Sequence, residues 1–269
     1  MTTLASAPPP LEDGWQPTTP QGDTLVRRYV DNHVALLHAV AKASQARTER
    51  TPSWAAADLG RPATIFSAAV LTHPSALSEM ARTVRELDAF FAQGSGSVYL
   101  WSPWPTPDLH RSGWQLEGHP PLLVRPPGGP VPATRDIEVA RVSDATAVGE
   151  WERIVVDGYP FPECQGSATR FLHPRVLDDP RLRLWLAFEG GRPVTASGLF
   201  DAYGVSHFMF GVTLPQVRRR GHWYAAVRQR LLASPNTPAV GVFSDDSRPG
   251  AERAGFLPIS RFTLWSRTR

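Results

Sequence analysis

An internal repeat is the feature that most constrains how this chain can fold. Residues 98–125 align with residues 240–267 without a gap, at a constant offset of 142. Upstream, residues 64–74 and 75–93 stand in the places of residues 205–214 and the helical stretch that follows them. We therefore predict two copies of one α/β unit. Seven of the 28 aligned positions are identical, more than composition alone would give: Val98/Val240, Ser102/Ser244, Pro107/Pro249, Arg111/Arg253, Gly113/Gly255, Leu122/Leu264 and Arg125/Arg267.

Beyond residue 136 the hydrophobic pattern predicts strands with helices between them. Gly190 and Gly191 indicate a hairpin turn, Ser143 or Asp144 is a candidate helix N-cap, and Pro215 is expected to open a helix. The predicted strands are 137–142, 182–190, 192–202, 205–214, 238–247 and 256–267, and the predicted helices are 145–159, 215–233 and 248–255.

The segment 125–135, RPPGGPVPATR, contains too much Pro and Gly for a helix or an interior strand, and it predicts a linker. The first residues contain much Pro and Thr, which is typical of a loose tail. We expect a flexible tail over 1–22, a first unit over 23–125, a linker over 126–135 and a second unit over 136–269.

Composition excludes several classes of protein. The 269 residues carry a net charge of +3 with the basic residues spread along the chain, so nucleic acid is not an expected partner. No apolar stretch reaches the roughly 20 residues that span a bilayer, and the N-terminus lacks a secretory pattern. Cys164 is the only cysteine, which excludes an intramolecular disulfide and thiolate pairs for zinc. We expect a cytoplasmic protein with no membrane partner and no metal.

The stretch LPQVRRRGHWYAAVRQRLL, residues 214–232, places three arginines and Gly221 ahead of a helix. A helix N-terminus attracts phosphate through its unpaired N–H groups and its dipole, and a glycine lets the backbone approach the anion closely. The alternative is a surface helix whose arginines are solvated, because one glycine is a weak signal. The first copy has LTHPSALSEM here, without glycine or arginine, so only the second copy carries the candidate site.

In its context this stretch resembles motif A of the GNAT superfamily, the Gcn5-related N-acetyltransferases, whose pattern is Q/R-x-x-G-x-G/A at a strand-to-helix turn. Arg218 and Gly221 match, whereas Trp223 stands where the family has Gly or Ala. The segment 252–256, ERAGF, is similar to the family's entry to its last strand. The resemblance implies an α/β (α+β) fold of two GNAT-like units, each a mixed, mostly antiparallel central sheet flanked by helices. It also implies that the first unit is degenerate and lacks the CoA loop.

The resemblance implies acetyl-CoA as the acyl donor, bound between strands 205–214 and 238–247. Pantetheine amides would pair with the backbone near Gly211, Val212 and Thr213. The pyrophosphate would lie on the N–H groups from Arg219 to Trp223, with charge from the arginines. Trp223 is tolerable only if its side chain points away from the phosphate, and the cofactor hypothesis fails if it points inward. The implied cofactor-binding residues are Gly211, Val212, Thr213, Arg218, Arg219, Arg220, Gly221, His222 and Trp223.

The candidate catalytic residues follow from what amide formation needs, which is a base for the amine and a proton for the departing thiolate. The family's usual acid, a tyrosine, is replaced by Ala251 here, so Tyr224, Ser244 or a water would have to serve, or the thiolate leaves unprotonated. For the base we expect His207 first and then Asp245 or Asp246. Each has a structural alternative, since a lone histidine on a strand is often a hydrogen-bonded core residue and the two aspartates could cap the next helix.

Three functions are compatible with these observations. The first is an acyl-CoA-dependent N-acyltransferase, most simply an acetyltransferase acting on a small-molecule amine. The alternative is a catalytically silent acyl-CoA-binding or scaffold protein, which the missing tyrosine and Trp223 both favour. The third is nucleic-acid binding through residues 218–220, which is weaker because no wider basic face or aromatic platform accompanies them. We expect a monomer with pseudo-dimeric halves or a homodimer.

Overall fold

The computed structural model describes residues 15–16, 19–20, 22–62, 64–159 and 171–269, so Cys164 and most of the predicted tail lie outside the described residues. No helix in these ranges is long and apolar enough to cross a membrane. The helices are α1 (Leu25–Ala43), α2 (Ser75–Ser78), α3 (Met80–Phe90), α4 (Ala145–Gly158), α5 (His222–Ala233) and α6 (Arg248–Arg253), with 3-10 turns η1 (Thr64–Phe66), η2 (His110–Ser112), η4 (Pro174–Asp178) and η5 (Pro215–Val217).

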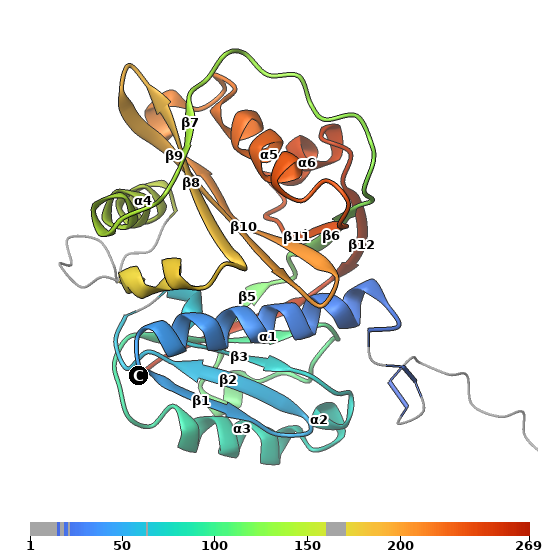
Figure 1. Cartoon of the computed structure of the whole chain (residues 1–269). Coiled ribbons are helices and arrows are strands. Elements are labelled where there is room, and N and C mark those ends of the chain that lie inside the picture. The colour runs from blue at the N-terminus through green and yellow to red at the C-terminus, as the bar shows by residue number, and fades with distance from the viewer. Residues whose placement is uncertain (1–14, 17–18, 21, 63, 160–170) are drawn as a thin grey trace, which may run out of the picture.

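The described strands form two sheets, which lie one above the other in Figure 1. One has the order β1-β2-β3-β4-β13-β5 and the other β12-β6-β11-β10-β9-β8-β7. In each, one neighbouring pair is parallel, β3 with β4 and β10 with β11, and the other pairs are antiparallel. The strands are β1 (Arg47–Arg50), β2 (Trp54–Asp58), β3 (Ala68–Leu71), β4 (Ser97–Ser102), β5 (Gln115–Gly118), β6 (Pro121–Arg125), β7 (Val139–Arg141), β8 (Leu182–Glu189), β9 (Arg192–Ala202), β10 (Val205–Thr213), β11 (Ala239–Val242), β12 (Leu257–Arg261) and β13 (Thr263–Thr268).

The two halves of the chain exchange a strand. β6, from the first half, lies between β11 and β12 of the second sheet, and β13, from the end of the chain, lies between β4 and β5 of the first. The predicted boundary at residue 125 therefore divides the chain but does not divide the sheets. The strand predicted over 256–267 is wrong as a single element, because the chain passes from one sheet to the other at Phe262, whose side chain is buried.

The two aligned segments of the predicted repeat share the same turn in the structure. Gly113 and Gly255 both adopt left-handed backbone, with φ of 79° and 88°, at the turn that enters β5 and β12. The next residues, Trp114 and Phe256, are both buried. The equivalent arginines cross between the halves: Arg125 Nε donates to the carbonyl of Ala254 at 2.9 Å, and Arg267 pairs with Asp88. The repeat and the exchange thus generate one pseudo-symmetric body.

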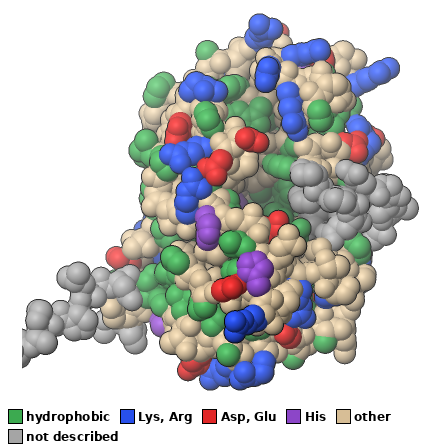
Figure 2. Space-filling model, turned by 180° about the vertical axis from the view of Figure 1, so that it is seen from behind, with side chains coloured by type: hydrophobic (Ala, Val, Ile, Leu, Met, Phe, Trp, Pro, Cys, Tyr) green, Lys and Arg blue, Asp and Glu red, His purple; other side chains and the backbone are tan. Residues whose placement is uncertain are grey.

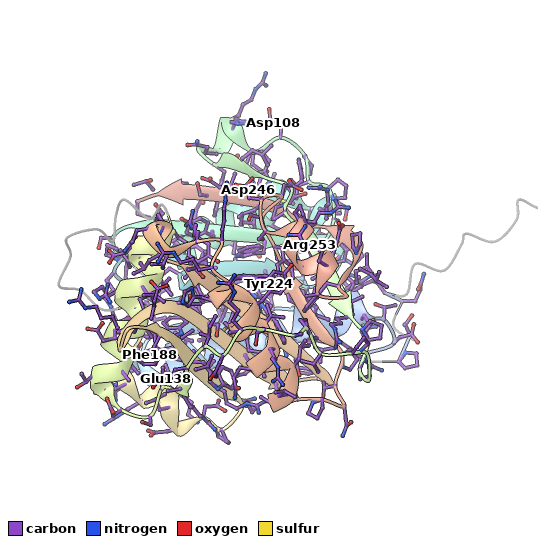
Figure 3. The ribbon with its side chains drawn as sticks, turned by 90° about the horizontal axis from the view of Figure 1, so that it is seen from above. Asp108, Glu138, Phe188, Tyr224, Asp246 and Arg253 are labelled. Atoms are coloured by element: carbon purple, nitrogen blue, oxygen red, sulfur yellow. The ribbon has the colours of Figure 1, made fainter. Side chains whose placement is uncertain are left out.

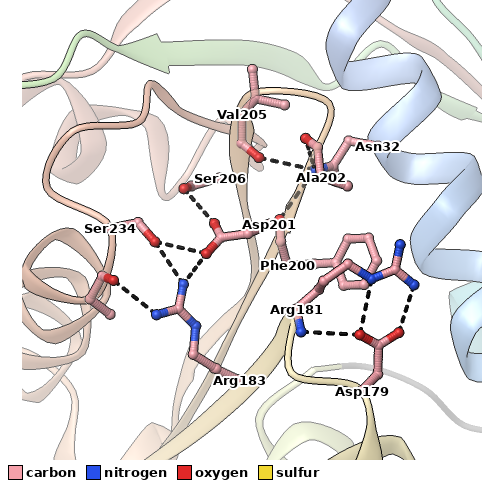
Figure 4. A network of polar contacts seen from close by, with 11 residues as sticks. Asn32, Asp179, Arg181, Arg183, Phe200, Asp201, Ala202, Val205, Ser206 and Ser234 are labelled. Carbon is pink, nitrogen blue, oxygen red and sulfur yellow. Dashed lines mark hydrogen bonds and ion pairs between the residues drawn. The ribbon is translucent and has the colours of Figure 1, made fainter.

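Helix α1 lies between the two sheets and belongs to both (Figure 1). Its Asn32 side chain donates from Nδ2 to the carbonyls of Phe200, Ala202 and Val205 at 3.0–3.2 Å, around the turn that joins β9 to β10 (Figure 4). The two N–H groups of this buried amide are shared among three carbonyls, which holds the helix against the β9–β10 turn. Residues of α1 therefore lie against the sheet that carries the candidate site.

Several local predictions are confirmed and one is wrong. Asp144 caps α4 by accepting from the N–H of Ala147 at 2.9 Å, and Gly190 and Gly191 form the β8–β9 turn. The helix predicted over 215–233 begins instead at His222, after the separate turn η5. Left-handed backbone at Arg219, with φ of 65°, interrupts the helical path, because L residues in this conformation cannot continue a right-handed helix.

The strand exchange predicts that neither half folds alone. If the chain is cut between Gly128 and Gly129 and the two fragments are expressed separately, each fragment lacks an interior strand of its sheet. In the first fragment β6 would expose Leu122, Leu123 and Val124, whose burial contributes roughly 1.5–3 kcal/mol each. We expect no cooperative thermal transition by circular dichroism for either fragment, and an equimolar folded complex on co-expression. A cooperative transition in one isolated fragment would contradict the exchange.

Candidate functional site

The candidate site begins where β10 and β11 separate. The two strands pair at Ser206 with Ala239 and at His207 with Val240, and beyond His207 they share no further pair. β11 continues to pair with β6, while β10 continues along β9. The result is a wedge, which we call the β10/β11 opening, with His207 at its vertex. Helices α5 and α6 follow these two strands.

A bulge in β10 begins after Met209, two residues beyond this vertex. The register with β9 shifts between Met209 and Val212, and Phe210 has left-handed backbone with φ of 48°. A bulge leaves carbonyls without a ladder partner. Side chains satisfy them here: Trp151 Nε1 donates to Ser197 O at 2.9 Å, Arg230 Nη1 donates to Gly198 O and Met209 O at 3.4 Å, and Trp223 Nε1 donates to Gly211 O at 3.1 Å.

The N-terminus of α5 has no side-chain cap. Its N-cap is Gly221, with φ of 97°, and the first bond of the helix runs from Ala225 N to Gly221 O at 3.1 Å. The N–H groups of His222, Trp223 and Tyr224 therefore have no partner within the helix. Together with the positive end of the helix dipole they form a group that attracts anions.

The three arginines before α5 have different environments. Arg218 donates to Thr213 O at 3.0 Å and to Gly158 O at 2.9 Å, so it ties the loop to β10 and α4 and does not face an anion. Arg220 pairs with Glu189 at 3.1 Å. Arg219 is exposed and makes no hydrogen bond or ion pair to any described residue. Viewed from behind, basic side chains gather on the upper part of the molecule, above a hollow lined by hydrophobic side chains (Figure 2).

A cleft of about 400 Å³ adjoins this helix N-terminus. Glu138 and Phe188, labelled in Figure 3, lie on its walls with Glu189, Arg220 and His222. His222 is buried, and its Nε2 lies 3.8 Å from Glu189 Oε1. The α5 N-terminus is therefore reachable from solvent on this side, through a rim that carries both signs of charge.

The indole of Trp223 points into the β10/β11 opening and not away from it, so the condition for donor binding that was set from the sequence is not met in this conformation. Besides its bond to Gly211 O, its ring lies against α6, where a Cβ on Gly250 would come within 3.4 Å of Trp223 Cζ3. The adjacent Tyr224 hydroxyl donates to Gly250 O at 3.2 Å and accepts from Arg253 Nε at 3.1 Å (Figure 3). The first turn of α5 thus bridges β10 and α6 across the opening, because the large ring fills space that Gly or Ala would leave.

His207 is buried at the vertex and is not solvated. Its Nε2 lies 3.3 Å from the Tyr29 hydroxyl, and its ring centroid lies 5.4 Å from that of His33. Burial lowers the pKa of His207 well below its usual value, and the nearby His33 and Arg230 lower it further. The imidazole is therefore neutral at pH 7, the form that can accept a proton.

The other candidate residues lie after β11 and are engaged elsewhere. Asp245 is exposed and forms a two-point ion pair with Arg261, at 2.8 and 3.2 Å, which lowers its pKa. The Ser244 hydroxyl bonds to Ser247 at 3.0 Å, and Asp246 is exposed (Figure 3). No hydrogen bond or ion pair joins them to His207 among the described residues. Ala251, at the position of the family's tyrosine, is fully buried.

Sequence reasoning missed Arg230, which is 1% exposed and has no carboxylate partner among the described residues. Its guanidinium lies over the ring of Phe208 at 4.3 Å, and burial lowers its pKa to about 9. The signal was present in the sequence: Arg230 follows Ala226 by four residues and Val227 by three, on the apolar face of the helix. An arginine on a buried helical face points to a polar group inside.

No protein-family model matches this chain, and no curated protein matches it in sequence. A GCN5-related N-acetyltransferase from Kribbella flavida has a TM-score of 0.63 and 20% identity, over 90% of this chain and 95% of that one. A putative GNAT-family acetyltransferase from Novosphingobium aromaticivorans has a TM-score of 0.55 and 15% identity, over 87% and 96%. A GCN5-related N-acetyltransferase from Sphaerobacter thermophilus has a TM-score of 0.52 and 13% identity, over 90% and 93%.

These likenesses establish the fold. The chain has the architecture of GNAT acetyltransferases over about 90% of its length, which confirms the predicted fold class and the predicted resemblance. At such low identity they do not transfer a substrate or a set of catalytic residues.

The two buried histidines predict loss of stability in acid. Burial lowers the pKa of His33 from 6.5 to about 4, and that of His207 well below 6.5. Both are neutral when folded and charged when unfolded below pH 6.5, so this contribution is complete above pH 6.5 and is lost as pH falls towards 4. We expect about 3 kcal/mol from His33 alone. Urea unfolding at pH 7.5, 5.5 and 4.5 measures it, and His207→Leu should show a shallower pH dependence. Parallel curves for the two proteins would contradict this assignment.

Proposed function

We propose that this protein is an acyl-CoA-dependent N-acyltransferase, which most simply transfers an acetyl group from acetyl-CoA to the amine of a small molecule. One observation carries the proposal: the uncapped N-terminus of α5 follows a bulged strand that separates from its parallel neighbour, within a GNAT fold. This arrangement offers anion-binding N–H groups beside a wedge that can admit an extended chain. The first half carries no equivalent glycine or arginine.

The residues at the α5 end of the expected donor site are free to bind the donor, whereas those at the β10 end are partly engaged by Trp223. At the α5 end, the N–H groups of His222 and Trp223 and the exposed Arg219 would hold the pyrophosphate. At the β10 end, the Gly211 carbonyl would accept from a pantetheine amide, but Trp223 already donates to it. The donor therefore fits once Trp223 leaves that carbonyl. When bound, it would supply the thioester carbon that an amine attacks.

His207 is the residue we propose as base. It is neutral, lies at the vertex of the opening and projects from the strand that carries the bulge. Tyr224 is the proposed acid, because its hydroxyl donates a hydrogen bond to the carbonyl of Gly250, the residue before Ala251. Tyr224 thus brings a phenol close to the position where the family has its tyrosine. Ser244, Asp245 and Asp246 receive no catalytic role, since their polar atoms are exposed or engaged by neighbouring groups.

We also propose that the acceptor is a small molecule and that the protein is a monomer. Exchange of β6 and β13 within one chain already supplies both sheets with the strand that a symmetric dimer would trade between subunits. The Trp223 ring partly fills the opening, which favours a small amine over a protein tail.

A second candidate is a catalytically silent acyl-CoA-binding protein. Two observations favour it: Ala251 replaces the usual acid, and Trp223 closes the donor site. Release of free CoA thiol from acetyl-CoA in the presence of a panel of small amines separates the candidates, because a silent binder gives none above the hydrolysis background.

Binding at the α5 N-terminus is tested by a thermal-shift titration with acetyl-CoA, CoA and ADP. A ligand at about 100 times its dissociation constant should stabilise the folded state by roughly 2.7 kcal/mol. Gly221→Glu should abolish the shift, because a carboxylate would stand at the anion site in place of a left-handed glycine. The matched control is Gly128→Glu, also left-handed but in open space. No shift in wild type or in Trp223→Ala would overturn the acyl-CoA proposal.

Trp223→Ala should strengthen binding of CoA. Removing the indole frees the Gly211 carbonyl and the space beside Gly250, so the donor no longer has to displace a hydrogen bond and a packed ring. We expect a roughly five- to thirty-fold lower dissociation constant by isothermal titration, equivalent to about 1–2 kcal/mol. Trp104→Ala, a partly buried tryptophan remote from β10, controls for general loosening. Weaker binding in Trp223→Ala than in wild type would show that the ring supports the donor.

A further inference from the structure

Four buried ring nitrogens lie without hydrogen-bond partners where the two halves meet. They are Nδ1 and Nε2 of His33, Nδ1 of His207 and Nε1 of Trp101. His33 is 3% exposed, His207 5% and Trp101 7%, so bulk solvent does not satisfy them. Buried polar atoms in folded proteins are nearly always paired with protein, water or ligand. Four such nitrogens close together are hydrogen-bonding groups with which a bound molecule could pair.

The rings that carry these nitrogens form one cluster with Tyr29, which we call the ring cluster. The centroids of His33 and His207 are 5.4 Å apart, as are those of His33 and Trp101, and Tyr29 lies 4.8 Å from His207. Tyr29 also packs edge-on against Phe262 at 5.4 Å. A core built only for packing would hold apolar rings here, because imidazoles without partners cost stability.

The ring cluster combines residues of both halves. Tyr29 and His33 come from α1 and Trp101 from β4, all in the first half, whereas His207 comes from β10 in the second. Tyr29 and His33 are one helical turn apart, so both face β10. The cluster lies at the vertex of the β10/β11 opening, since His207 is the last residue of β10 that pairs with β11.

We propose that the ring cluster is the amine-recognition end of the acceptor site, and that the first half, which lost its own donor site, supplies His33 and Tyr29 to it. This inference rests on the proposed acyl transfer. The ligand class is a small primary amine. His33 and His207 present the ring nitrogens that accept from it, and Tyr29 is a positioning residue that acts through His207.

The proton balance follows from the hydrogen bond to Tyr29. With its proton on Nε2, His207 donates to the Tyr29 oxygen and keeps the Nδ1 lone pair free. The acceptor binds as the neutral amine and donates an N–H to Nδ1. As its electron pair attacks the carbonyl carbon its nitrogen becomes positively charged, that N–H bond breaks, and an N–H bond forms at Nδ1. The imidazolium keeps its bond to Tyr29. The titratable or charged groups that face His207 are Tyr29 and His33 from α1 and Arg230 from α5.

Amine recognition can be tested without any acyl donor. Protein labelled with ¹⁵N in its histidine rings is titrated with methylamine and followed by NMR. We expect saturable shifts of the ring signals of His33 and His207, assigned with His33→Leu and His207→Leu, and none for His38. His38 is the matched control because it lies on the same helix, with a buried ring nitrogen that also lacks a partner, but outside the cluster. Absence of shifts at His33 and His207, or equal shifts at His38, would overturn the proposal.

Transfer assays give the second test. His33→Leu should lower kcat/KM for the amine at least tenfold, with an unchanged CoA thermal shift and an equal or higher Tm, because it removes two unpaired nitrogens. His33→Gln should recover part of the lost kcat/KM, and His38→Leu should leave kcat/KM as in the wild type. Tyr29→Phe should move the acid limb of the rate profile to lower pH, since the imidazolium loses its acceptor. Unchanged kcat/KM in His33→Leu, or a loss matched by a fall in Tm, would overturn the proposal.

The two tests separate this inference from the proposed function. If CoA does not bind and no amine is acylated, yet methylamine shifts the signals of His33 and His207, the ring cluster is an amine site and the acyl-transfer proposal fails. If CoA binds and amines are acylated while His33→Leu is as active as wild type, acyl transfer holds and the ring cluster is overturned.

Discussion

The exchange of β6 and β13 is the constraint on which the rest of the structure depends. An interior strand pairs along both edges, so each half supplies the strand that closes the other half's sheet. Without that strand, each sheet would be interrupted and would present two additional open edges. The halves therefore cannot move as independent domains joined by a linker, and a site built from residues of both is held as firmly as one built within a single sheet.

The position of α1 follows from that exchange and determines the electrostatics of the site. Because the sheets are fixed to each other, α1 is enclosed between them and Asn32 secures it to the β9–β10 turn. Its side chains remove water from the vertex of the β10/β11 opening. Charges interact strongly in such surroundings and solvation is weak, so His207 stays neutral and Arg230 loses part of its affinity for its proton.

Sequence alone predicted much of the fold, and the reasons for its failures are physical. The repeat aligned Gly113 with Gly255, and both residues adopt left-handed backbone in the structure. The sequence could not reveal the exchange, because the apolar residues of β6 and of β13 could be buried in either sheet. The start of α5 depends on left-handed backbone at Arg219, which side-chain periodicity does not reveal. The direction of Trp223 and the approach of His33 to β10 are tertiary outcomes that no local pattern encodes.

The bulge in β10 shows which part of the site can change and which cannot. Its carbonyls are satisfied by Trp151 and Arg230, both almost fully buried, and by Trp223, which is only partly buried. Withdrawing either of the first two would leave a carbonyl unpaired in the core, which costs more than the bond itself contributes. Withdrawing Trp223 is different, because another N–H entering along the opening would restore the bond to Gly211 and the indole would gain solvent. The bulge is therefore bonded to fully buried side chains where it faces the core and to a partly buried one where it faces α5, which is the arrangement that the proposed binding of an amide-bearing donor requires.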